Sequence, residues 1–154
     1  IAEMVEKTVG TCTVTQLNRV IENSACMSSD VSAAVDPNYL SVSEERNSSY
    51  AGYGVAIMKY TGSRGKYDSS DAGAEFVYEI GNIMDSNNVI WQTGELGKVD
   101  QGGGGTIAQY VANLNMNVID CGVPVLSMHS PFEVVAKSDV YMAYKAYKAF
   151  YMNR

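Results

Sequence analysis

The only histidine of this chain, His129, is its most versatile candidate for chemistry. It follows the apolar run 124–128 and precedes Ser130-Pro131, a position typical of the end of a buried strand. Ligands collect at the carboxyl edge of α/β sheets, and neutral imidazole serves as a metal ligand or an acid–base group. The position is equally consistent with a structural histidine held by hydrogen bonds. A histidine-rich site built from this chain alone is excluded.

Asp30 is the second candidate. It ends the run 25–30 of small and apolar residues, where an unpaired carboxylate would be costly. Coordination of a metal and capping of a turn both account for an acid at this place. From the residues alone, the cap is the favoured interpretation.

The polar segment 94–106 is the loop richest in glycine, with four consecutive glycines at 102–105 and Asp100 just before them. Glycines let backbone N–H groups approach a substrate closely, and the start of the following helix favours an anion. A flexible loop without a ligand is the alternative. The segment lacks the GxxxxGK[ST] pattern of a P-loop and the glycine spacing of a dinucleotide fingerprint. Asp30, Asp100 and His129 therefore form one candidate site.

A small group of cations is the last candidate. Lys59 stands near the end of an apolar run, and Arg64 and Lys66 follow it in a glycine-containing stretch. Such a group could bind a carboxylate. Ordinary solvated charges are the more economical interpretation. The Tyr and Lys residues between 141 and 148 are better explained by a surface or interface than by stacking of nucleic-acid bases.

Alternating strands and helices must position these residues, which predicts an α/β fold. We expect strands at 25–30, 53–60, 89–93, 118–121 and 124–128, a turn at 36–38, and a glycine-rich loop at 61–66. The periodicity of apolar residues predicts helices at 1–9, 13–24, 71–85 and 106–115. Ser130-Pro131-Phe132-Glu133 resembles a capping box and predicts a last helix from there to about Tyr151.

Composition narrows the class of protein. A chain of 154 residues corresponds to one domain, and 46% hydrophobic residues allow a real core. The net charge of −6, without a basic stripe, argues against nucleic acid and anionic membranes as partners. Three widely spaced cysteines provide no disulfide framework, which fits a reducing cytoplasm. The chain starts at Ile1 without an initiator Met, so we expect a piece of something longer.

Three segments carry a resemblance to a known family. The string GKVDQGGGGTIAQYVANLNMNVIDCGVPVLSMHSPFEVVAKSDVYMAYKAYKAF resembles the C-terminal end of the aspartyl aminopeptidase / aminopeptidase I family of metallopeptidases. Upstream, ENSACMSSDVSAAVDPNYLSVSEERN and IMKYTGSRGKYDSSDA match the same family in the same order. The resemblance covers about residues 16–151.

The resemblance implies a zinc aminopeptidase with two metal ions per active site, cobalt or manganese being alternatives. Its catalytic domain is an α/β sandwich, a mixed sheet flanked by helices. The Asp of the family's S-x-D motif falls on Asp30 and the His of its MHS motif on His129, each serving one metal ion. We expect the two side chains to converge within several ångströms at the carboxyl ends of strands.

The resemblance also implies that much of the enzyme lies outside this chain. The family's other ligands, its catalytic Glu and its dimerisation domain belong to an upstream half, and Glu44-Glu45 does not replace the catalytic pair. Residues 1–154 are then the C-terminal portion of a catalytic domain, holding two of five metal ligands and no catalytic base. The isolated chain is expected to be inactive.

Further positions follow from the resemblance. Lys59 matches a lysine near the substrate pocket, and Asp100 and Gly104 border the same cleft. Aspartyl-specific members have a His three residues after the metal-binding Asp, where this chain has Ala33, so a strict preference for acidic N-terminal residues is in doubt. Peptides are the expected substrates, and a tetrahedral dodecamer of identical subunits is the expected assembly. The rival hypothesis is a non-catalytic module that pairs with another chain.

Overall fold

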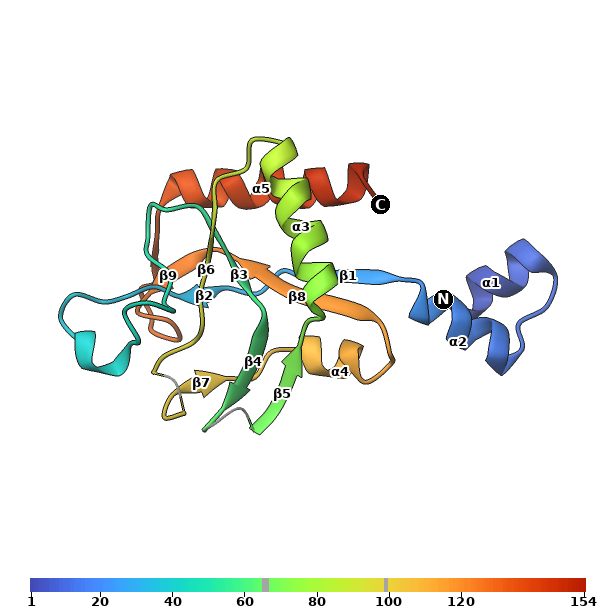
Figure 1. Cartoon of the computed structure of the whole chain (residues 1–154), viewed down its shortest axis with the longest axis horizontal. Helices are drawn as coiled ribbons and strands as arrows, with labels where there is room; N and C mark the ends of the chain where they lie inside the picture. The colour runs from blue at the N-terminus through green and yellow to red at the C-terminus, as the bar shows by residue number, and fades with distance from the viewer. Residues whose placement is uncertain (65–66, 99) are drawn as a thin grey trace.

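A computed structural model describes residues 1–64, 67–98 and 100–154 (Figure 1). The helices are α1 (Ala2–Val9), α2 (Val14–Glu22), α3 (Ala74–Ser86), α4 (Ala108–Ala112) and α5 (Lys137–Met152), with a short 3-10 helix η1 at Leu40–Val42. The strands are β1 (Ala25–Ser28), β2 (Ser32–Ala33), β3 (Val55–Met58), β4 (Tyr60–Ser63), β5 (Tyr67–Asp71), β6 (Trp91–Thr93), β7 (Gly103–Gly104), β8 (Asn117–Gly122), β9 (Pro124–Leu126) and β10 (Val134–Val135).

A mixed four-stranded sheet in the order β1-β8-β3-β6 forms the centre of the body. β1 runs parallel to β8, β3 runs parallel to β6, and β3 and β8 are antiparallel. Two smaller sheets, β10-β9-β2 and β5-β4-β7, extend this arrangement. Strands and helices alternate along the chain, so the predicted mixed α/β class is confirmed.

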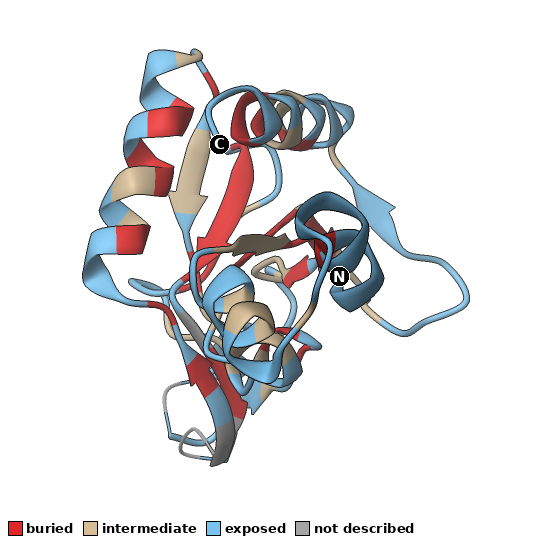
Figure 2. Ribbon diagram, turned by 90° about the vertical axis from the view of Figure 1, so that its right-hand side faces the viewer, coloured by how far each residue is buried: buried red, intermediate tan, exposed pale blue. Residues whose placement is uncertain are grey.

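The hydrophobic core lies between the central sheet and the helices α3 and α5. Side chains of β3 and β8, such as Ile57 and Ile119, meet Phe76 and Ile80 of α3 and Phe150 of α5 there. Figure 2 shows buried residues along the central strands and in patches on the helices that cover them. Because side chains alternate along a strand, the neighbours of these residues, including Asp120, face the opposite side of the sheet.

Asp139, in the first turn of α5, connects that helix to the chain entering β3. Its side chain is fully buried, and its carboxylate accepts hydrogen bonds from Gly52 N at 2.6 Å and Gly54 N at 3.0 Å. Backbone donors satisfy the charge that burial would otherwise make costly. This contact sets the position of α5 over the sheet.

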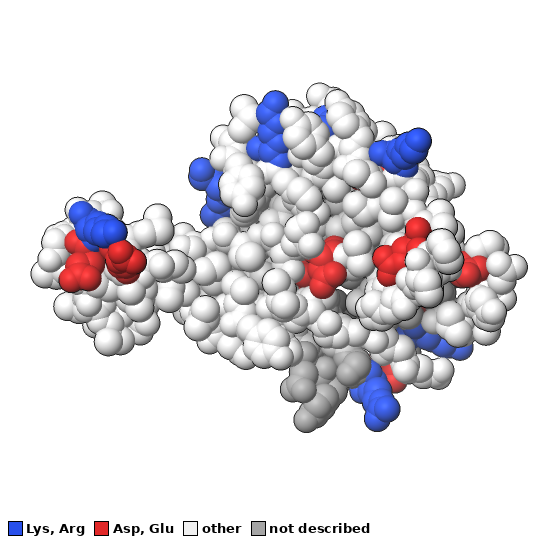
Figure 3. Space-filling model, turned by 180° about the vertical axis from the view of Figure 1, so that it is seen from behind, with Lys and Arg blue, Asp and Glu red and all other residues white. Residues whose placement is uncertain are grey.

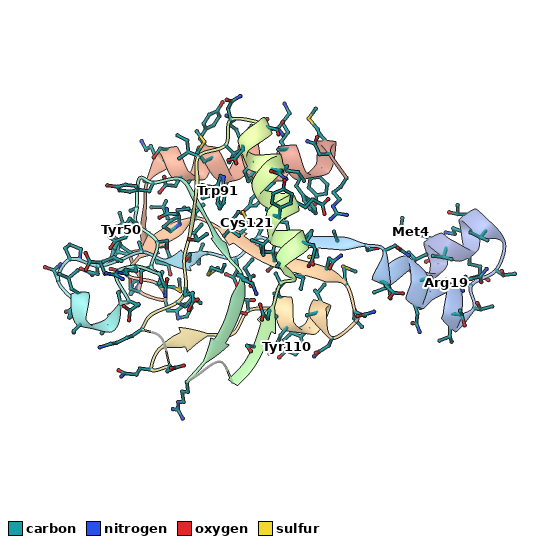
Figure 4. All side chains as sticks on the ribbon, in the orientation of Figure 1. Met4, Arg19, Tyr50, Trp91, Tyr110 and Cys121 are labelled. Carbon is teal, nitrogen blue, oxygen red and sulfur yellow. The ribbon has the colours of Figure 1, made fainter. Side chains whose placement is uncertain are left out.

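The two N-terminal helices form a hairpin that projects from one side of the body, with Met4 and Arg19 far from the core (Figures 1 and 4). The predicted boundaries are confirmed: Gly10 ends α1 in a left-handed conformation, and Thr13 with Gln16 forms a capping box for α2. Val5 is the buried hydrophobic residue of α1, and α2 contains none. The apolar faces of the hairpin are therefore largely exposed.

Two sequence predictions are wrong at element boundaries. The segment 61–66 is not simply a loop, because residues 61–63 belong to β4, which pairs with β5 and β7; residues 65 and 66 lie outside the described part. The last helix starts at Lys137 rather than at Ser130. Ser130 Oγ accepts from Phe132 N within a turn, and Val134–Val135 pairs with β9, which removes these residues from the helix.

The boundaries of two further helices also differ from the prediction. α3 begins at Ala74 instead of Asp71, because Asp71 pairs with Tyr60 in the ladder of β5 and β4. α4 covers Ala108–Ala112 of the predicted 106–115 helix, and the glycines before it, Gly103–Gly104, form the strand β7. No helix among the described residues is long and apolar enough to cross a membrane.

Thiol labelling tests the placement of β8 in the core. Cys121 has no exposed surface, and burial, with the nearby charge of Asp120, raises the pKa of its thiol to about 12 (Figure 4). Only the thiolate reacts with iodoacetamide, so at pH 8 roughly one Cys121 thiol in 10,000 is reactive. We expect native chain to be alkylated at the partly exposed Cys12 first and not at Cys121, and unfolded chain to be alkylated at all three cysteines. Peptide mass spectrometry measures this, and equal labelling of Cys121 and Cys12 in native chain would contradict the fold.

A glycine substitution tests the contact between β8 and the segment after β1. A Cβ atom added at Gly122 would lie 1.3 Å from the carbonyl oxygen of Asp30, which is backbone and cannot move aside. We expect Gly122→Ala to lower the free energy of unfolding by more than about 4 kcal/mol, a large part of the roughly 5–15 kcal/mol that stabilises a typical domain. The matched control is Gly105→Ala, where nothing lies within 4 Å of the added atom. Urea unfolding at one protein concentration compares the two, and a Gly122→Ala chain as stable as the control would overturn this packing.

Candidate functional site

Asp30 lies in the short link between β1 and β2. Its carboxylate Oδ1 accepts a hydrogen bond from Val31 N at 2.8 Å, and the residue is partly buried. This hydrogen bond joins neighbouring residues and closes no turn, so it does not show the turn-capping role that the sequence favoured. The carboxylate still has unused acceptor capacity, because a carboxylate offers about four lone-pair sites.

His129 follows β9 at the start of the turn that leads to β10. Its backbone is in the left-handed region with φ of 66°, as is that of Ser127 with φ of 58°. The N–H of His129 donates to Glu133 Oε1 at 2.5 Å, which holds the turn in this conformation. Residues forced into this region often occur at functional sites, and the imidazole itself is exposed.

Strand pairing relates these two residues. Asp30 precedes β2, His129 follows β9, and β2 and β9 are parallel neighbours. The backbone of Asp30 lies against Gly122, and His129 is seven residues farther along that same segment. Both residues follow the carboxyl end of a strand, β1 for Asp30 and β9 for His129. The convergence of the two side chains stays a prediction.

The donor types of this pair suit zinc, which binds carboxylate oxygen and imidazole nitrogen. Zinc in catalytic sites has three protein ligands, one more than this pair. Within residues 1–64, 67–98 and 100–154, no group of three His, Cys, Asp or Glu side chains could hold a metal ion. The donor types of Asp30 and His129 therefore suit zinc, and a complete catalytic site would need further ligands.

Lys59 lies where the central sheet ends, at the carboxyl ends of the parallel strands β3 and β6. It lines a small cavity of about 90 Å³ together with Asn47, Thr93 and Glu95. Its ammonium group is already paired with the carboxylate of Asp71, on the exposed surface. The expected cluster with Lys66 falls outside the described residues. A substrate carboxylate would therefore have to compete with Asp71 for Lys59.

The glycine-rich segment is more ordered than a flexible loop. Gly103–Gly104 forms β7 and pairs antiparallel with Gly62 and Ser63 of β4. Asp100 is exposed in a turn with φ of 63°. The structure thus places Gly104 at the edge of a three-stranded sheet and Asp100 in the turn before it.

Asp120 is a buried acid that the sequence analysis did not single out. It is 1% exposed, and its Oδ2 accepts from Thr106 Oγ1 at 2.9 Å. Burial raises the pKa of this carboxyl above its ordinary value; the hydroxyls of Ser28 and Thr106 counteract this, and the charge of Asp30 adds to it. The sequence did contain a signal for this buried acid, because it stands inside the otherwise apolar string Val118-Ile119-Asp120-Cys121.

Comparison with known proteins identifies the family. The chain matches the aminopeptidase I zinc metalloprotease family (M18) over residues 1–151. A probable M18 family aminopeptidase 1 from Clostridium acetobutylicum is 53% identical over 138 residues, which are 90% of this chain and 30% of that protein. The chain therefore spans about a third of the length of its relatives.

Solved structures agree with this match. The crystal structure of an M18 aminopeptidase from Thermotoga maritima superposes with a TM-score of 0.92 at 45% identity, covering 96% of this chain and 33% of that one. The mApe1 dodecamer of S. cerevisiae shares the fold, with a TM-score of 0.74 at 20% identity over 97% of this chain and 32% of that one. This chain belongs to the M18 family of aminopeptidase I zinc metalloproteases.

Proposed function

We propose that this chain is the C-terminal part of the catalytic domain of a zinc-dependent aminopeptidase that removes N-terminal residues from peptides. The observation that carries the proposal is the match to the M18 family over residues 1–151, which contains both Asp30 and His129. The upstream half of the domain and the dimerisation domain lie outside this chain in this proposal. The chain spans about a third of the length of its relatives, which supports this division of the domain.

Asp30 and His129 would each hold one of two zinc ions. Bound zinc would activate water for attack on the peptide carbonyl, as in other co-catalytic metal sites. The general base is a Glu of the missing half, so no residue of this chain is assigned that role. The hydrogen bond from Val31 N to the Asp30 carboxylate and the strained backbone of His129 support the assignment, because ligands must be held in place before the metal binds.

Lys59, Asp100 and Gly104 are proposed to contact the substrate. Gly104 would present backbone to the peptide, and Lys59 would attract a carboxylate of the substrate when it leaves Asp71. Ala33 in place of the family's histidine argues against strict selection of acidic N-terminal residues. A preference for neutral residues is therefore expected alongside any acidic one.

The intact protein is proposed to assemble from identical subunits, as the yeast mApe1 dodecamer does. The described residues include two exposed apolar surfaces that could form interfaces between subunits. One is the hairpin, with Met4, Val9 and Val14 exposed by more than 60%; the other is the outer face of α5, where Tyr141 and Tyr144 stack. In Figure 3, basic side chains lie at the top of the body, at its bottom and on the hairpin, and acidic ones lie across the middle and on the hairpin.

The first prediction concerns the metal ligands in the complete polypeptide that contains this chain. We expect it to hydrolyse aminoacyl p-nitroanilides, to lose activity with a chelator and to regain it with zinc. Asp30→Asn or His129→Gln should lower kcat by at least about 100-fold, because each removes a ligand. Asp36→Asn is the matched control, since Asp36 also accepts a backbone N–H at 2.8 Å and should leave kcat unchanged.

Equal effects of Asp30→Asn and Asp36→Asn would refute the assignment of Asp30. An intact polypeptide that ends at these 154 residues would instead favour the rival function, a non-catalytic module that pairs with another chain. The length of the native polypeptide distinguishes the two, because the enzyme requires a chain about three times as long.

The second prediction concerns the 154-residue chain alone. Two ligands leave most of each zinc coordination shell to water, so we expect weak zinc binding and no hydrolysis. Isothermal titration calorimetry and the p-nitroanilide assay measure both. Chelator-sensitive hydrolysis by the purified chain would contradict the division of the active site proposed above.

The third prediction concerns association of the chain alone. Its exposed apolar surfaces should make it self-associate or leave it marginally stable. Light scattering should show a mass above 16.7 kDa that rises with concentration. A stable monomer whose melting temperature does not depend on concentration would show that residues 1–154 form a complete domain.

A further inference from the structure

Asp120 connects the central sheet to the start of α4. Its Oδ2 accepts from Thr106 Oγ1 at 2.9 Å, and the same hydroxyl oxygen accepts from Ala108 N at 3.2 Å. All three residues are buried. Thr106 therefore ties the first turn of α4, and the glycines immediately before it, to β8.

The other carboxylate oxygen of Asp120 faces the strand that leads to Asp30. Ser28 of β1 is the register partner of Asp120 in the parallel pair, so both side chains lie on the same face of the sheet. Ser28 Oγ and Asp120 Oδ1 are the buried side-chain oxygens that lack a hydrogen-bond partner in the described residues. One is a donor and the other an acceptor, and buried groups of this kind are normally paired.

We propose that Asp120 is a positioning residue of the aminopeptidase site, receiving the Thr106 hydroxyl on one oxygen and the Ser28 hydroxyl on the other. The inference rests on the function proposed above. Ser28 precedes Asp30 by two residues, and Thr106 follows Gly104 by two. One buried carboxylate thereby holds the link that carries the proposed ligand Asp30 at a fixed separation from the segment that carries Gly104.

A second contact makes this linkage stiff. Gly122, two residues beyond Asp120 on β8, touches the carbonyl of Asp30, where even a Cβ atom would not fit. β8 is thus in contact with both ends of the segment 28–30. Because misplacement of a catalytic group by about 1 Å can cost 100-fold in rate, a rigid link between metal and substrate elements has a direct effect on catalysis.

The test uses the complete polypeptide, saturated with zinc, and separates kcat from KM. Thr106→Val releases the glycine segment and should raise KM about 10-fold while kcat changes by less than about 3-fold. Ser28→Ala releases the link that carries Asp30 and should lower kcat about 10-fold with KM within about 3-fold. Asp120→Asn should preserve both constants within about 3-fold, because the amide can accept from Thr106 and donate to Ser28. Asp120→Leu should impair both.

The Thr61–Ser70 pair provides matched controls. It is a buried hydroxyl pair 3.2 Å apart on β4 and β5. Thr61→Val and Ser70→Ala should lower the melting temperature as Thr106→Val and Ser28→Ala do, but leave kcat and KM within about 2-fold of the wild type.

A higher KM in Thr106→Val and a lower kcat in Ser28→Ala, both absent from the controls, with near-normal constants in Asp120→Asn, would support the inference. If the wild type is active and the Ser28 and Thr106 variants behave like the controls, Asp120 is a structural residue and the inference is wrong. If the wild type has no aminopeptidase activity, the proposed function fails and the inference fails with it. Should Asp120→Leu not fold, the Ser28 and Thr106 variants still decide the question.

Discussion

The pairing of β1 with β8 is the constraint on which the rest of this structure depends. It joins the chain around residue 27 to the chain around residue 119, in register from Ala25 to Ser28. This register sets Asp120 opposite Ser28 and brings the Asp30 carbonyl against Gly122. A shift by one residue would turn Ile119 and Cys121 away from the core and place a side chain where only a glycine fits.

From this strand pair, the two candidate ligands take their places. Asp30 lies just after β1, where its carboxylate accepts from Val31 N. His129 lies in a strained turn after β9 that Glu133 stabilises. The helix α5, fastened through the buried Asp139, covers the other face of the sheet. Asp120 thus lies on the face of the sheet opposite the core formed with α3 and α5, and Thr106 bonds to it there.

Local signals in the sequence were sufficient for part of this fold. The helices near 1–9 and 13–24 and the turn at 36–38 depend on contacts between residues close in sequence, and each was predicted. The start of α5 and the strand β7 were not, because Val134 pairs with Leu126 and Gly104 with Gly62 through tertiary contacts. Asp120 escaped notice for the same reason: its partners Ser28 and Thr106 are distant in sequence. Asp30 and His129 are proposed as ligands through their motifs, because spacing along the chain does not reveal ligands that lie on separate strands.

The central claim is that Asp30 and His129 are metal ligands completed by residues outside this chain. A crystal structure of the complete polypeptide grown with zinc, with anomalous scattering recorded on both sides of the zinc edge, tests it most directly. The account predicts two zinc ions about 3.5–4 Å apart, one bound by the Asp30 carboxylate and the other by the His129 imidazole. Zinc bound at a site that includes neither side chain would contradict it.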